Sequence, residues 1–127
     1  MPVVIHPLSE AELEAAAVIL RSAFQRPGNW LNDLRFNRGL QTDGYFGAYQ
    51  DGVLIGMVGA IIYSAFAYVG MMGVHQDFQR RGLGLALMQH LLMWLDESNV
   101  SLVLLDASKA GQPLYEKLGF VAHENVY

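Results

Sequence analysis

The stretch Gln79-Arg80-Arg81-Gly82-Leu83-Gly84 decides how this chain folds, because it joins a strand-like run to a helical one. The apolar residues 66–74 precede it, and leucines recur every four residues from Leu83 to Leu95 after it. A turn at this junction places free backbone N–H groups at the positive end of the helix dipole, and its glycines let an anion approach the backbone closely. The stretch therefore predicts a phosphate site, with Arg80 and Arg81 adding positive charge.

Two familiar nucleotide-binding loops do not match this turn. A P-loop ends in Gly-Lys-Ser/Thr, and the dinucleotide fingerprint requires a third glycine where Leu87 stands. ATP and NAD are therefore disfavoured as ligands. The plainer alternative is that the glycines only form a tight strand-to-helix corner, with both arginines solvated on the surface.

Strand-like and helical runs extend outward from the turn. Before it we expect a strand at 3–5, a helix opened by the Ser9–Glu12 capping box, a second helix over 30–38, and a hairpin of strands 44–49 and 53–63. After it we expect a helix over 83–97, a strand at 101–105, a short helix at 113–118 and a final strand from Phe120. The strands at 66–74 and 101–105 flank a helix and should therefore be parallel. The pattern predicts one α/β domain over residues 1–127, with a mixed sheet covered by helices on both faces.

The composition narrows the classes of function. With 53% hydrophobic and 16% charged residues, the 127-residue chain is expected to fold from end to end. It has no cysteine, which excludes disulfides, cysteine-ligated zinc and a thiol nucleophile. Its four histidines lie far apart, so we expect no metal site. A net charge of -4 disfavours nucleic acid, and the lack of a long apolar run predicts a cytoplasmic protein with no membrane partner.

Two motifs resemble those of one known family. The run from Val74 to Gly84 resembles the Q/R-x-x-G-x-G/A motif of the GNAT acetyltransferase superfamily, and Leu114-Tyr115-Glu116-Lys117-Leu118-Gly119-Phe120 is similar to its L-Y-x-K-x-G-F segment. They stand in the family's order, with one helix and one strand between them. The resemblance covers essentially the whole chain and implies the GNAT-like acyl-CoA N-acyltransferase fold, a three-layer α/β/α arrangement. It also implies a single N-acetyltransferase domain.

The chain departs from the family's pattern in three places. Gln76 stands where a proline is common, and Ser108 stands where an asparagine is common. Family members also continue for one more strand, whereas this chain stops at Tyr127. The fold is therefore expected to lack its last strand.

The resemblance implies acetyl-CoA as the cofactor. It implies a sheet that splays open beside the 66–74 strand, where the pantetheine arm pairs with the backbone, and a pyrophosphate bound by the N–H groups of residues 80–85. The residues assigned to the cofactor are Met72, Gly73, Val74, Gln79, Arg80, Arg81, Gly82, Leu83, Gly84, Leu85 and Ser108.

Acyl transfer to an amine needs a proton acceptor for the ammonium and a proton donor for the departing thiolate. Tyr115 matches the family tyrosine that serves as the donor, and its alternative role is to pack the last helix onto the sheet. Asp106 is the first candidate base, although an aspartate in this position also commonly caps the following turn. His75 and a water molecule are the other candidates for the base. The oxyanion contact is assigned to a backbone N–H near Val74.

The expected function is direct transfer of an acetyl group from acetyl-CoA to a primary amine of a small molecule or peptide. One alternative is a catalytically silent CoA-binding sensor or interaction module of the same fold, and another is a site for a different phosphorylated ligand. Four aromatic residues either line the acceptor pocket or fill the core, namely Trp30, Tyr45, Tyr63 and Tyr68.

The end of the chain also predicts an assembly. A missing strand would leave unpaired backbone groups on the strand at 101–105, so this edge needs another partner. The final strand can pair with that edge directly, or a second copy can supply a strand. We expect the second route, and hence a homodimer formed through the C-terminal part of the sheet.

Overall fold

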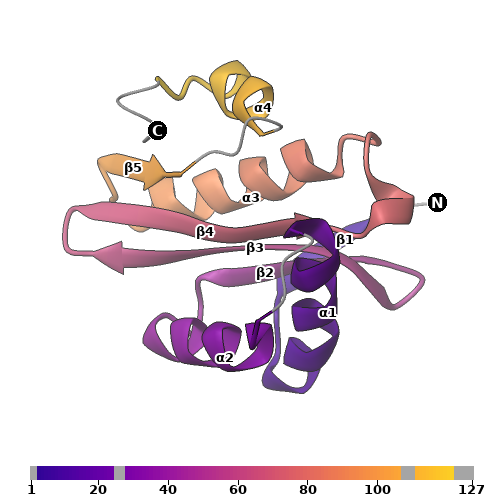
Figure 1. The fold of residues 1–127 in the computed structure, drawn as a ribbon. Coiled ribbons are helices and arrows are strands. Elements are labelled where there is room, and N and C mark those ends of the chain that lie inside the picture. The colour runs from indigo at the N-terminus through magenta and orange to yellow at the C-terminus, as the bar shows by residue number, and fades with distance from the viewer. Residues whose placement is uncertain (1–2, 25–27, 107–110, 122–127) are drawn as a thin grey trace.

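A five-stranded sheet with the strand order β1-β2-β3-β4-β5 forms the centre of the fold (Figure 1). The computed structural model describes residues 3–24, 28–106 and 111–121. The first four strands are antiparallel neighbours, namely β1 (Val4–Pro7), β2 (Tyr45–Gln50), β3 (Val53–Tyr63) and β4 (Phe66–Val74). The fifth strand, β5 (Leu102–Leu105), is parallel to β4, as the helix between them predicts.

Helices cover both faces of the sheet. The helices α1 (Leu13–Phe24) and α2 (Trp30–Leu40) lie on one face, and α3 (Leu83–Glu97) lies on the other with the short α4 (Gln112–Lys117) beside it (Figure 1). The expected three-layer α/β/α architecture is thereby confirmed. In the part of the chain that the structure describes, no helix is long and apolar enough to cross a membrane.

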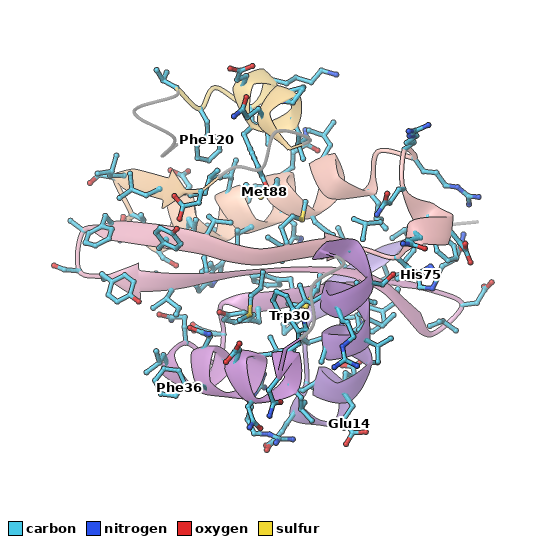
Figure 2. All side chains as sticks on the ribbon, viewed as in Figure 1. Glu14, Trp30, Phe36, His75, Met88 and Phe120 are labelled. Atoms are coloured by element: carbon cyan, nitrogen blue, oxygen red, sulfur yellow. The ribbon has the colours of Figure 1, made fainter. Side chains whose placement is uncertain are left out.

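Two hydrophobic clusters hold the layers together. The α3-side core consists of Phe46, Ala48, Ile55, Val58, Ala60, Ala67, Val69, Leu83, Leu87, Met88, Leu91, Leu95, Leu105 and Tyr115. The α1-side core consists of Leu8, Leu13, Ala16, Leu20, Leu34, Tyr45 and Met57. Figure 2 shows Met88 and Trp30 on opposite sides of the sheet, whereas Glu14 and Phe36 point away from it. The helical spacing of the leucines in α3 therefore marks the face that packs on the sheet.

Local sequence signals explain the element boundaries. In the hairpin between β2 and β3, Asp51 and Gly52 have φ angles of 52° and 78°, as a tight turn of the primed type requires. Ser9 donates from its N–H and its hydroxyl to Glu12 Oε1, at 3.0 and 2.7 Å. This capping box opens a 3-10 turn (Glu10–Glu12) that continues into α1.

The expectation of a final strand beginning at Phe120 is wrong at its start. Phe120 and Val121 belong to no strand, and residues 122–127 lie outside the described residues. The Phe120 N–H donates to the carbonyl of Tyr115 at 3.0 Å, and Gly119 takes a φ of 97°. Phe120 is therefore part of the C-terminal turn of α4, because this bond and the left-handed glycine form the usual end of a helix.

The capping box gives a first prediction. Replacing Ser9 by Ala should lower the free energy of unfolding by about 1 kcal/mol, because the first turn loses its side-chain partner. Chemical denaturation of the variant and the wild type measures the difference. Glu12→Gln is the matched control, since its amide oxygen still accepts both bonds and stability should change little. An unchanged Ser9→Ala variant would show that the capping box does not stabilise α1.

Candidate functional site

A cavity of about 620 Å³ lies where β4 and β5 part. Five segments that are far apart in the sequence contribute to its wall: β4, the glycine turn before α3, the end of β5, α4 and the C-terminal part of α1. The lining residues are Ala23, Val69, Gly70, Met71, Met72, Gly73, Val74, Phe78, Gln79, Arg80, Gly82, Leu83, Gly84, Leu105, Asp106, Gly111, Leu114 and Tyr115. The cavity therefore joins both sequence motifs in one site.

The cavity exists because β5 accompanies β4 over only part of its length. The two strands pair from Phe66 with Leu102 to Val69 with Leu105, and the described part of β5 ends there. Beyond Val69, β4 continues to Val74 and still pairs with β3 on its other edge. The edge of β4 that faces the cavity therefore offers backbone N–H and C=O groups to an extended ligand, as an exposed sheet edge does in strand addition.

A bulge shapes this part of β4. The register between β3 and β4 shifts between Met57 and Gly59, and Met71 has a φ of 55°. A bulge bends its strand and increases the twist. At Gly70 an added Cβ would meet no atom within 4 Å, whereas at Gly73 it would lie 3.2 Å from Leu20 Cδ2 of α1. β4 therefore lies close against α1 at one glycine and leaves open space at the other.

The glycine turn presents the N-terminal end of α3 to the cavity. Gly82 precedes the helix with a φ of 78° and no side-chain cap, and the first helical bond runs from the Ala86 N–H to the Gly82 carbonyl at 3.1 Å. The N–H groups at the start of α3 precede this first bond and point out of the helix end. The Gln79 side chain ties the turn to β4 by donating from Nε2 to the Val74 carbonyl at 3.0 Å. This arrangement is suited to binding an anion.

The two arginines of the turn point in different directions. Arg80 has a φ of 64° and lines the cavity, whereas the Arg81 guanidinium lies 5.3 Å from the centre of the Phe78 ring. Arg81 also lines a separate cavity of about 240 Å³ together with Gln50 and other residues. Arg80 is therefore the arginine placed to meet a phosphate in the large cavity, and Arg81 makes a cation–π contact.

Tyr115 stands on the α3 side of the cavity. It belongs to the α3-side core, only 8% of its surface is exposed, and its ring contacts Phe120 edge-on at a centroid distance of 6.0 Å. Burial raises the pKa of the Tyr115 phenol above its usual value of 10.0. The phenol is therefore protonated at neutral pH and able to donate.

Asp106 meets the cavity from the other face of the sheet. It follows Leu105, whose side chain is in the α3-side core, so by strand alternation its carboxylate points towards the α1 side. There the Tyr68 hydroxyl donates to Asp106 Oδ2. Burial, and next the hydrogen bond and charge of Asp106, raise the pKa of Tyr68 to about 12. Sequence reasoning named both residues but did not connect them.

Two of the expected site residues do not line the cavity, and a third is not among the described residues. Arg81 and Leu85 do not line it, and Ser108 lies outside the described residues. The other eight residues expected to contact the cofactor line one cavity together with Tyr115 and Asp106, namely Met72, Gly73, Val74, Gln79, Arg80, Gly82, Leu83 and Gly84. Among residues 3–24, 28–106 and 111–121, no group of three or more His, Asp or Glu side chains could hold a metal.

The other candidates also lie elsewhere. His75, an alternative base, accepts at Nδ1 from the Asp77 N–H at 3.1 Å and packs its ring edge-on against Phe78. Tyr45 is buried in the α1-side core, and Tyr63 stacks on Phe66 at 5.4 Å. Trp30 packs against the α1-side core, so three of the four aromatic residues have packing roles.

Sequence reasoning missed several lining residues. Ala23 enters from α1, and Leu105 enters from the end of β5. Gly70 carried a usable signal, because a glycine inside an apolar strand often marks close backbone approach by a ligand. Ala23 carried none, since nothing local distinguishes it from the other alanines of α1.

Comparisons with known proteins agree with this geometry. The model of the acetyltransferase (GNAT) family matches residues 9–120. The uncharacterised N-acetyltransferase YitH of Bacillus subtilis (strain 168) is 34% identical over 83 residues, which is 64% of this chain and 29% of that protein. The chain thus spans less than a third of this curated relative.

Solved structures share the fold. A crystal structure of a proposed acetyltransferase from Pyrococcus horikoshii has a TM-score of 0.90 at 29% identity, covering 95% of this chain and 44% of that one. The ribosomal-protein-S18-alanine N-acetyltransferase of Escherichia coli has a TM-score of 0.82 at 28% identity, covering 96% of this chain and 79% of that one.

Proposed function

This chain belongs to the acetyltransferase (GNAT) family, and we propose that it transfers an acetyl group from acetyl-CoA to a primary amine of a small molecule or peptide. The observation that carries the proposal is the meeting of two distant motifs. The glycine turn at 79–84 and Tyr115 of the second motif line the same cavity. One supplies groups suited to phosphate, and the other supplies a buried proton donor beside it.

The residues of the cavity fit CoA. The open edge of β4 over 70–74 provides backbone partners for the amide groups of a pantetheine arm. The N-terminal end of α3 provides N–H groups for the pyrophosphate, and Arg80 provides a positive charge. Gly70 leaves open space where this edge begins.

Two side chains serve the chemistry. Acetyl-CoA supplies the acetyl group as a thioester, whose carbon accepts the nitrogen of an uncharged amine. In the overall reaction a C–N bond forms, the C–S bond breaks, and the ammonium loses two protons, of which one ends on the CoA thiol and one in solvent. Tyr115 gives the thiolate its proton and regains one from the nitrogen, and Asp106 takes the other proton from the ammonium and releases it to solvent.

The environment of Tyr115 suits this role. Burial raises the pKa of the phenol, so the protonated form that donates persists through neutral pH and is lost only as pH rises through that raised pKa. The same burial disfavours a lasting phenolate, so Tyr115 must regain its proton as it gives one away.

A homodimer is part of the proposal. β5 is the outer strand of the described sheet, and its residue Leu102 is 53% exposed although it is apolar. Val121, at the end of the last described segment, is 78% exposed. A second copy that adds a strand beside β5 would cover this edge.

CoA binding is the first test of the function. CoA at 100 times its dissociation constant should stabilise the folded protein by about 2.7 kcal/mol, measured as a rise in melting temperature. Gly82→Val should abolish that rise, because its side chain projects into the open space at the start of α3 and because valine strains a φ of 78°. Gly52→Val is the matched control, because Gly52 has the same φ of 78° and equally open surroundings in a remote turn. An unchanged melting temperature of the wild type in millimolar CoA would refute the proposal.

Turnover tests the role of Tyr115. Tyr115→Phe should keep its affinity for CoA and lose about 100-fold in kcat, because the proton donor is gone while the ring still packs. Thiol release from acetyl-CoA across a panel of amines measures it. Normal turnover in this variant would remove Tyr115 from the mechanism. CoA binding without thiol release for any amine in the wild type would instead identify a silent CoA-binding module.

Sedimentation tests the assembly. At micromolar concentration we expect the mass of a dimer, and substituting Leu102 by Lys should shift the protein towards the monomer, because it places a charge on the covered edge. A monomeric wild type with amide protons of β5 that exchange slowly would show that the chain closes its own sheet.

A further inference from the structure

The point where β4 and β5 part has two chemically different faces. Tyr115 is in the α3-side core and approaches from that face. Tyr68 pairs across the sheet with Ile61, which packs against the α1-side core, and directly paired residues share a face. Tyr68 and Asp106 therefore lie on the face opposite Tyr115, and Asp106 lines the cavity from there.

The cavity is also divided in charge. Of the described residues that line it, Arg80 and Asp106 are the ones that carry a charge. Arg80 lies in the glycine turn before α3, whereas Asp106 follows β5. One end is thus suited to an anion, and the end at the parting of the strands is suited to a cation.

The carboxylate of Asp106 is held in place from β4. Tyr68 donates to one of its oxygens, Oδ2, and a carboxylate has a second oxygen that can accept from another donor. Tyr68 stays protonated at neutral pH and so remains a donor, because burial and the neighbouring carboxylate raise its pKa. The hydrogen bond spans the two strands at the mouth of the gap between them.

We propose that the Tyr68–Asp106 pair binds the ammonium group of the acceptor, and that the acceptor is therefore an alkylamine that arrives protonated. This inference rests on the proposed acetyltransferase function. Asp106 meets the ammonium and takes one of its protons, which leaves the nitrogen lone pair free. Tyr68 is a positioning residue, which holds the carboxylate at the cavity and does not itself touch the reacting atoms.

A test of the pair needs a control variant that loses a tie between the strands without changing the cavity. Ser101 makes a second side-chain tie between the same parts of the fold, since its hydroxyl donates to the carbonyl of Ala65 in the turn before β4 at 3.2 Å. Ser101 is not among the residues that line the cavity. Ser101→Ala is therefore the matched control for loss of a tie at β5 without loss of ammonium binding.

The experiment compares two kinds of amine. Thiol release from acetyl-CoA is measured with aniline, which is uncharged at neutral pH, and with the alkylamine that the wild type acetylates fastest in a panel. For Tyr68→Phe we expect kcat/KM for the alkylamine to fall about tenfold, mainly through KM, because a hydrogen bond to a charged group is lost. For Tyr68→Phe, kcat/KM for aniline and the affinity for CoA should stay within about twofold of the wild type. For Ser101→Ala, kcat/KM for both amines and the affinity for CoA should also stay within about twofold. A twofold change is clearly smaller than the expected tenfold change, which corresponds to about 1.4 kcal/mol.

Each outcome decides the proposal. Equal losses with aniline and the alkylamine, or equal losses in Tyr68→Phe and Ser101→Ala, would show that the pair only ties the strands together. A wild type that binds CoA and acetylates aniline but no alkylamine would overturn this inference and leave the proposed function standing. A wild type that binds no CoA would overturn both.

Discussion

The structure depends on the fact that, within the described part of the chain, β4 has strand partners on both edges as far as Val69 and on one edge beyond it. Inside a sheet an unpaired edge costs free energy unless another group forms its hydrogen bonds. A fold that keeps such an edge therefore keeps a place for an extended polar ligand. The bulge at Met71 and the open space at Gly70 lie at neighbouring residues of β4. The strand is therefore bent at the same point where it leaves room for a ligand.

The glycine turn and α4 are positioned by this opening. Gln79 bonds back to the carbonyl of Val74, which places the start of α3 at the end of the open edge. A Cβ on Gly84 would lie 3.2 Å from Met72 Cε and 3.4 Å from Leu114 Cδ2, so α3 approaches both β4 and α4 at this glycine. The groups that this geometry offers to a ligand are largely those of the backbone.

Most of the fold could be predicted from local patterns, because hydrophobic periodicity and turn residues act over short distances. The leucines of α3, the Asp51-Gly52 turn and the capping box of Ser9 each specify their own element. The site was predictable only in part. The contact between Tyr68 and Asp106 joins residues 38 positions apart, and the divergence of Arg80 from Arg81 depends on a backbone angle and on the Phe78 ring. Phe120 was misread because its apolar character suits a strand, whereas its N–H completes the end of α4.

The end of α4 has a mechanical consequence. The carbonyl of Tyr115 accepts from the N–H groups of both Leu118 and Phe120, so the residue whose phenol faces the cavity also anchors the chain where it leaves the helix. The Phe120 ring also contacts the Tyr115 ring edge-on, so this one residue links the end of α4 to the cavity wall. The position of Tyr115 in the cavity wall therefore depends on Leu118 and Phe120, two residues that do not themselves line the cavity.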